Sequence, residues 1–115
     1  MRTRSGRIVR FGEVTLPASK SESNRALMIA AYGGFAPDFQ NLSDSNDTKV
    51  LLRALKGKTP LIDIADCGTA ARFMTTYLAC HEGEWILMGT ERMKQRPIMP
   101  LVKSLRELGA DIQFV

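Results

Sequence analysis

Hydrophobic and polar positions along the chain predict short strands alternating with amphipathic helices. Apolar residues recur every three or four positions in four stretches, which predict helices over about 23–32, 43–55, 69–80 and 97–108. Short apolar runs bounded by turn residues predict strands at 8–9, 14–16, 39–42, 61–64, 84–88 and 111–115. This alternation is typical of an α/β (α+β) fold, with no low-complexity linker along the chain.

Turn and capping residues set the expected helix ends. Gly33 and Gly34 are expected to end the first helix, Gly57 the second, and Gly109 the last. Pro97 is expected to be the first residue of the last helix, because proline fits a helix start.

Composition indicates one folded piece at the small end of the domain range, with 115 residues and 44% apolar content. The 16 Lys and Arg against 12 Asp and Glu give a net charge of +4, which helps to steer anions toward the protein. Two cysteines are too few for a disulfide framework, so a reducing cytoplasm is the expected location. The basic segment 1–7 lacks the apolar run of a signal peptide, and no membrane span is expected.

The segment 16–25 predicts a site for a small anion. It reads as a strand end, a polar loop and a helix start that carries Lys20, Ser21 and Arg25. A phosphate can accept hydrogen bonds from several unpaired N–H groups of a first helical turn, and the two cations would add charge. Plain N-capping by serine is the alternative. A Walker loop is excluded, because the glycines that curl around a triphosphate are missing.

Two later segments repeat this arrangement. Gly68 begins a Gly-Thr turn before an apolar helix, and glycine allows close backbone approach to a ligand. Arg92, Lys94 and Arg96 crowd the segment 89–97 before the last helix. Singly, these features are a turn glycine and a solvated basic cluster. Together they predict that Lys20, Arg25, Gly68 and Arg92 converge on one face.

Four motifs in a fixed order extend over nearly the whole chain from about Gly12: LPASKSESNRAL, NLSDSND, DCGTAARF and GTERMKQRPI. In this order they closely resemble the N-terminal part of the 5-enolpyruvylshikimate-3-phosphate synthase (3-phosphoshikimate 1-carboxyvinyltransferase) family. The sister UDP-N-acetylglucosamine enolpyruvyl transferases share the fold and are the alternative. They typically have Asn and Ala after the lysine, where this chain has Ser-x-Ser-x-Arg.

The resemblance implies transfer of the carboxyvinyl group of phosphoenolpyruvate to the 5-hydroxyl of shikimate-3-phosphate, with release of phosphate, in chorismate and aromatic amino-acid biosynthesis. It implies that Lys20, Ser21 and Arg25 bind shikimate-3-phosphate, and that Lys20, Gly68 and Arg92 bind phosphoenolpyruvate. Thr69 and Ser23 are weaker candidates. No cofactor or metal is implied. The general acid and base lie in later parts of the family's longer chain, so this piece is expected to be an inactive fragment of a monomeric enzyme.

The family fold is an inside-out α/β barrel of repeated β-α-β-α-β-β units. By that resemblance, residues 1–12 belong to one domain and 13–115 begin the other. Cys67 departs from the family, which usually has Ala there, and Asp66 stands where many members have Asn. The thiol is either slightly reactive beside the ligand or only a small tolerated side chain.

Two other functions are compatible with the residues alone. A standalone phosphate-binding domain would use the same residues and would not need the remaining part of a longer enzyme. A nucleic-acid-binding module is suggested by four arginines among the first ten residues, but few aromatics are placed to stack on bases. Small anionic substrates are therefore the expected partners, and nucleic acid is not.

Overall fold

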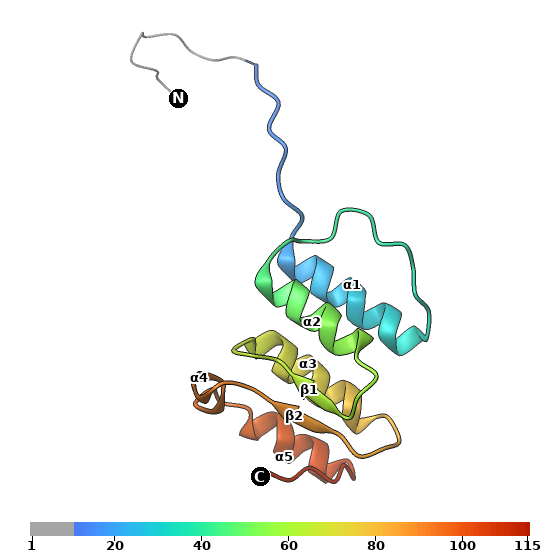
Figure 1. Cartoon of the computed structure of the whole chain (residues 1–115), viewed down its shortest axis with the longest axis vertical. Coiled ribbons are helices and arrows are strands. Elements are labelled where there is room, and N and C mark those ends of the chain that lie inside the picture. The colour runs from blue at the N-terminus through green and yellow to red at the C-terminus, as the bar shows by residue number, and fades with distance from the viewer. Residues whose placement is uncertain (1–10) are drawn as a thin grey trace.

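The structure, a computed structural model, describes residues 11–115. Helices dominate it, and two short strands lie between them (Figure 1). In chain order the elements are α1 (Lys20–Gly33), α2 (Asn46–Lys56), β1 (Leu61–Asp63), α3 (Gly68–Ala79), β2 (Ile86–Met88), α4 (Glu91–Lys94) and α5 (Met99–Glu107).

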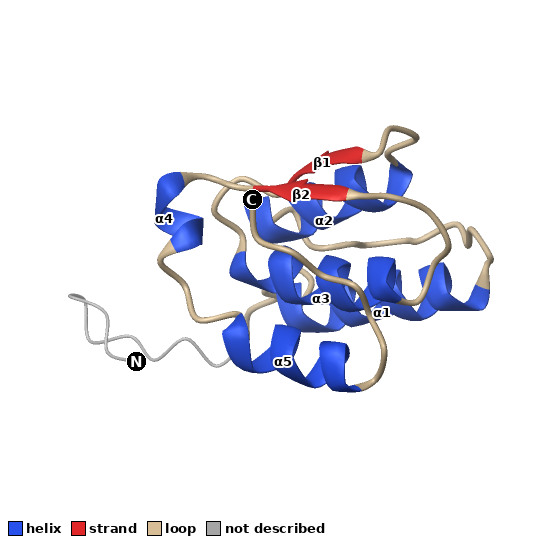
Figure 2. Ribbon diagram, turned by 90° about the horizontal axis from the view of Figure 1, so that it is seen from below, coloured by secondary structure: helices blue, strands red, loops and turns tan. Residues whose placement is uncertain are grey.

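The two strands pair in parallel, with Leu61 opposite Ile86 and Asp63 opposite Met88. A parallel pair needs a crossover connection, and α3 supplies it, so β1, α3 and β2 form a β-α-β unit. Figure 2 shows the strands side by side, with α1, α3 and α5 to one side of them. Ile62 is buried whereas its neighbours along the strand are exposed, as expected for a sheet covered on one face. These features confirm a mixed α/β fold.

The core lies where α1, α2, α3 and the sheet meet. Its buried members are Leu27, Met28, Val50, Leu51, Ala54, Ile62, Ile64, Cys67, Ala70, Ala71, Met74 and Met93. The helix α2 packs against both α1 and α3, and Figure 1 shows it between them. The spacing of α1 and α3 therefore depends on how each is fixed to α2.

Side-chain caps fix the helix starts. Ser19 caps α1 by accepting a hydrogen bond from Glu22 N at 3.3 Å, so α1 begins at Lys20, earlier than the predicted start near Ser23. Ser45 caps α2 in the same way, with Thr48 N as donor. The predicted end of α1 is confirmed, because Gly34 adopts the left-handed conformation, with φ of 68°, that favours glycine.

Three predicted strands are wrong. Residues 14–16, 39–42 and 111–115 form no strand, and residues 8–9 lie outside the described part of the chain. Val14 and Leu16 are largely exposed, without the neighbouring strand that pairing requires. Asn41 has a φ of 60°, which interrupts extended backbone. The last segment is instead held by a side chain, because Arg106 Nε donates to Ile112 O at 2.8 Å.

The region around the last helix also differs from prediction. Segment 91–94 forms the short helix α4, which the pattern did not reveal, with Thr90 as its N-cap. Pro97 precedes α5, which begins at Met99 and has Pro100 in its first turn. The expected end is confirmed: α5 stops at Glu107, and Gly109 has a φ of 101°.

Candidate anion-binding site

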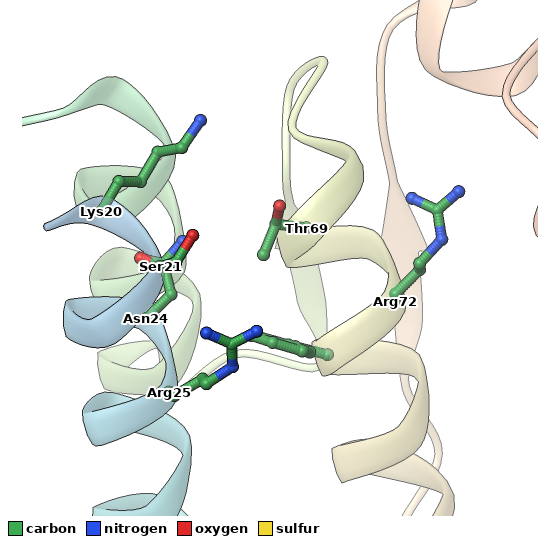
Figure 3. Close-up of a pocket in the computed structure, with 7 residues that line it drawn as sticks. Lys20, Ser21, Asn24, Arg25, Thr69 and Arg72 are labelled. Atoms are coloured by element: carbon green, nitrogen blue, oxygen red, sulfur yellow. The ribbon is translucent and has the colours of Figure 1, made fainter.

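A cavity of about 270 Å³ lies between the first turns of α1 and α3 (Figure 3). The residues that line it are Lys20, Ser21, Asn24, Arg25, Thr69, Arg72 and Phe73. Figure 3 shows Lys20, Ser21, Asn24 and Arg25 on α1, with Thr69 facing them from α3. Three predicted binding residues, Lys20, Ser21 and Arg25, are therefore brought together.

The α1 side of the cavity carries positive charge and hydrogen-bond donors. The first N–H groups of a helix have no partner within it, and they attract anions together with the helix dipole. Lys20 is the first residue of α1, and Ser21 and Arg25 follow at positions one turn apart. Arg25 is exposed and forms no ion pair within residues 11–115. A phosphate in the cavity could therefore accept from both the guanidinium and the serine hydroxyl.

Lys20 already has an anionic partner in the protein. Its Nζ lies 3.1 Å from Asp47 Oδ2, and half of the lysine side chain is exposed. Exposed ion pairs contribute about 0–1 kcal/mol. Lys20 is thus held near the cavity mouth by an interaction that a doubly charged ligand can outcompete.

Gly68 begins α3 and is buried, but it does not line the cavity. Two guanidinium groups lie over it: a Cβ added there would be 2.5 Å from Arg96 Nη1 and 3.2 Å from Arg72 Nη1. Arg72 also donates to Gly68 O and to Pro97 O, each at 3.1 Å, so it joins the start of α3 to the loop before α5. Gly68 therefore lies at a second basic cluster beside the cavity.

Arg92 lies in α4 and does not line the cavity either. Its side chain is 75% exposed, and Nη1 is 4.0 Å from Asp66 Oδ2, the limit of an ion pair. The predicted group is thus brought together only in part: Lys20 and Arg25 share the cavity, while Gly68 and Arg92 lie outside its lining.

Sequence reasoning missed three lining residues, Asn24, Arg72 and Phe73, and gave Thr69 little weight. Helical spacing was the available signal, because Asn24 follows Lys20 by four residues and Phe73 follows Thr69 by four. Ser23 has a structural contact: its buried Oγ accepts from Ser43 N at 2.9 Å.

Cys67 is the N-cap of α3 and is buried. Its Sγ accepts from Ala70 N at 3.3 Å. Burial raises the pKa of the Cys67 thiol, and the nearby Asp47 carboxylate raises it further, although the hydrogen bond from Ala70 opposes the shift. A buried thiol with a raised pKa is a poor nucleophile, so the structure favours a small packed side chain over a reactive one.

Within residues 11–115, no three His, Cys, Asp or Glu side chains are grouped closely enough to hold a metal ion. None of the described helices is both long and apolar enough to cross a membrane.

Comparison with known proteins gives consistent results. The model of the EPSP synthase (3-phosphoshikimate 1-carboxyvinyltransferase) family matches residues 57–115. The 3-phosphoshikimate 1-carboxyvinyltransferase of Bacteroides fragilis (strain YCH46) is 52% identical over 102 residues, which cover 89% of this chain and 25% of that protein. The one from Colwellia psychrerythraea is 38% identical over 130 residues, which cover 90% of this chain and 30% of that protein. The chain thus spans about a quarter of the length of the Bacteroides fragilis relatives. No solved structure matches it.

Proposed function

Since the chain belongs to the EPSP synthase family, we propose that it forms part of the substrate-binding surface of a 3-phosphoshikimate 1-carboxyvinyltransferase. The reaction transfers the carboxyvinyl group of phosphoenolpyruvate to the 5-hydroxyl of shikimate-3-phosphate and releases phosphate. The observation that carries the proposal is the cavity in which Lys20, Ser21 and Arg25 meet at the N-terminus of α1.

Shikimate-3-phosphate would place its phosphate at this cavity. The Arg25 guanidinium offers a planar pair of donors that suits phosphate oxygens, and Ser21 adds a hydroxyl. Lys20 lies at the mouth, where it would reach both substrates once it leaves Asp47. The α1 side of the cavity carries cations and helix dipoles, and no carboxylate lines the cavity. The phosphate of the ligand would supply the negative charge that balances them.

Phosphoenolpyruvate would bind near Lys20, Gly68 and Arg92. Support comes from the start of α3, where two guanidinium groups lie over Gly68, and from the exposure of Arg92, which leaves its side chain free to turn toward a ligand. Positive groups there would stabilise charge on the departing phosphate and so lower the barrier to the reaction.

Proton transfer requires residues other than these. A general acid must protonate the vinyl carbon and a base must accept the hydroxyl proton, and we assign neither role within the chain. We infer that the chain binds ligand but gives no turnover by itself. Turnover of shikimate-3-phosphate by the purified chain would contradict the inferred lack of activity.

We further propose that the chain contributes to an inside-out α/β barrel, with 1–12 in one domain and 13–115 in the other. The complete protein would be a monomeric cytoplasmic enzyme that needs no cofactor.

A binding comparison tests the proposed function. Shikimate-3-phosphate is titrated into the chain and into Arg25→Ala, with amide chemical shifts as the readout. Loss of a charge-assisted contact of about 1.5–3 kcal/mol should weaken binding at least tenfold. Arg53→Ala is the matched control, because Arg53 is also exposed but lies away from the cavity on α2.

Two outcomes would contradict the assignment. One is an equal loss of affinity in Arg25→Ala and Arg53→Ala. The other is tighter, strongly salt-dependent binding of an oligonucleotide, which would favour the nucleic-acid module instead.

A further inference from the structure

A buried polar junction joins α1 to α2 directly behind the cavity. Thr48 is 1% exposed and Asn24 is 2% exposed. Thr48 Oγ1 donates to Asn24 Oδ1 at 2.8 Å and also lies 2.9 Å from Ser45 Oγ, the N-cap oxygen of α2. One hydroxyl thus connects the cap of α2 to a side chain of α1.

Polar groups at this depth favour one arrangement of the two helices. Burying an amide and a hydroxyl is unfavourable unless they bond to each other, and their bond tolerates only a narrow range of distance and angle. An apolar contact would tolerate sliding. A second buried bond, from Ser43 N to Ser23 Oγ at 2.9 Å, lies next to the first along α1. The first two turns of α1 are therefore fixed against the start of α2.

Asn24 connects this junction to the ligand site. It lines the cavity itself, four residues after Lys20, three after Ser21 and one before Arg25. The other wall comes from α3, which packs against α2. A shift of α1 along α2 would therefore move all three predicted phosphate contacts relative to Thr69 and change the width of the cavity.

We propose that Thr48 is a positioning residue for the anion cavity: through its hydrogen bond to Asn24 it sets the place of Lys20, Ser21 and Arg25 opposite α3. Thr48 does not touch the ligand, since it is not among the lining residues. The inference rests on the proposed function, because it takes shikimate-3-phosphate as the ligand.

The test replaces Thr48 with valine, which keeps the shape and removes the hydroxyl. We expect the dissociation constant of shikimate-3-phosphate to rise about fivefold to tenfold in Thr48→Val, the range that loss of one hydrogen bond produces. Thr48→Ser keeps the hydroxyl and should restore affinity to within about twofold. Amide chemical shifts give the affinity, and thermal unfolding of the same samples gives the stability.

Thr75→Val is the matched control. Thr75 Oγ1 donates to Ala71 O at 2.7 Å within α3, and the residue does not line the cavity. This variant should keep the affinity of the unsubstituted chain even if it unfolds at a lower temperature. A merely structural role for Thr48 would make the two valine variants alike.

The remaining outcomes distinguish the positioning role from the proposed function. Unchanged affinity in Thr48→Val, whatever its melting temperature, would overturn the positioning role and leave the proposed function intact. If Thr48→Val does not fold, Thr48→Cys supplies a weaker donor of similar size, and affinity equal to that of the unsubstituted chain would overturn the role. Failure of the unsubstituted chain to bind shikimate-3-phosphate would overturn both statements.

Discussion

Lys20 and Asp47 form an ion pair at the mouth of the anion cavity, with 3.1 Å between Nζ and Oδ2. Lys20 is the first residue of α1 and Asp47 lies in the first turn of α2. The carboxylate holds the ammonium near the cavity, but its negative charge also opposes an incoming phosphate. Both effects operate at one partly exposed site, so their balance depends on ionic strength.

Asp47→Asn should separate the two effects. It removes the negative charge and keeps the size of the side chain. We expect inorganic phosphate to bind more tightly at low salt, by about twofold to fivefold, and this gain to disappear at high salt. The free energy of unfolding should change by less than about 1 kcal/mol, because the pair is partly exposed. Weaker phosphate binding at every salt concentration would show that holding Lys20 in place matters more than the charge.

Lys20→Ala should affect both substrates, unlike Arg25→Ala. The proposed contacts of Lys20 include both ligands, so a full-length enzyme with this change should show weaker binding of shikimate-3-phosphate and of phosphoenolpyruvate, together with lower kcat. Loss of a charged contact should raise the dissociation constant of each ligand by about tenfold or more. A change confined to one substrate would contradict the proposed double role. Lys103→Ala, an exposed lysine of α5, is the control.

The sequence predicted the helical parts of the site well, because their signals are local. Ser19, Ser45 and Gly34 act at helix ends through contacts within a few residues, so all four predicted helices exist with small shifts at their ends. The Lys20, Ser21 and Arg25 group follows from the same helix start. Ser21 and Arg25 are four residues apart, so a helix alone places them together, and Lys20 joins them because α1 begins earlier than predicted.

The features that the sequence did not predict depend on partners that are distant along the chain. A strand at 14–16, 39–42 or 111–115 would need a neighbouring strand, and the described residues provide pairing only between β1 and β2. The contact of Thr48 with Asn24 spans 24 residues, and that of Arg72 with Pro97 spans 25. The local pattern does not show which distant residue each of these side chains contacts.

Gly68→Ala should weaken phosphoenolpyruvate binding more than shikimate-3-phosphate binding. The new Cβ would be 2.5 Å from Arg96 Nη1, which must move, but this atom is the end of a flexible side chain. The fold should therefore survive with little loss of stability, while the basic cluster over the start of α3 is rearranged.

Titration of each ligand into a full-length enzyme that carries the change is the measurement. Gly109→Ala is an unsuitable control, because the φ of 101° there strains any side chain. Gly12→Ala is better, since nothing lies within 4 Å of its added Cβ. Equal weakening of both ligands would place Gly68 between the two sites.

The two cysteines should differ sharply in reactivity. Cys80 is exposed, whereas Cys67 is buried and burial raises the pKa of its thiol. Because only the thiolate attacks a disulfide reagent, we expect one thiol to react rapidly at neutral pH and the other slowly. In Cys80→Ser the rapid phase should vanish, and in Cys67→Ala the slow phase should vanish. A rapid reaction of Cys67 in the Cys80→Ser variant would show a reactive thiol beside the cavity.

The raised pKa of the Cys67 thiol predicts that the free energy of unfolding falls as pH rises through the alkaline range. A folded-state pKa above the unfolded value means that the fold favours the neutral thiol of Cys67. Its contribution is fully present below the unfolded pKa and is lost as pH rises through the higher folded value. Cys67→Ala should therefore lose less stability than the unsubstituted chain over that alkaline range, when denaturant unfolding is followed at each pH. If the thiol had no such effect, the unsubstituted chain and Cys67→Ala would lose stability in parallel as pH rises. Cys80→Ser is the control for the exposed cysteine.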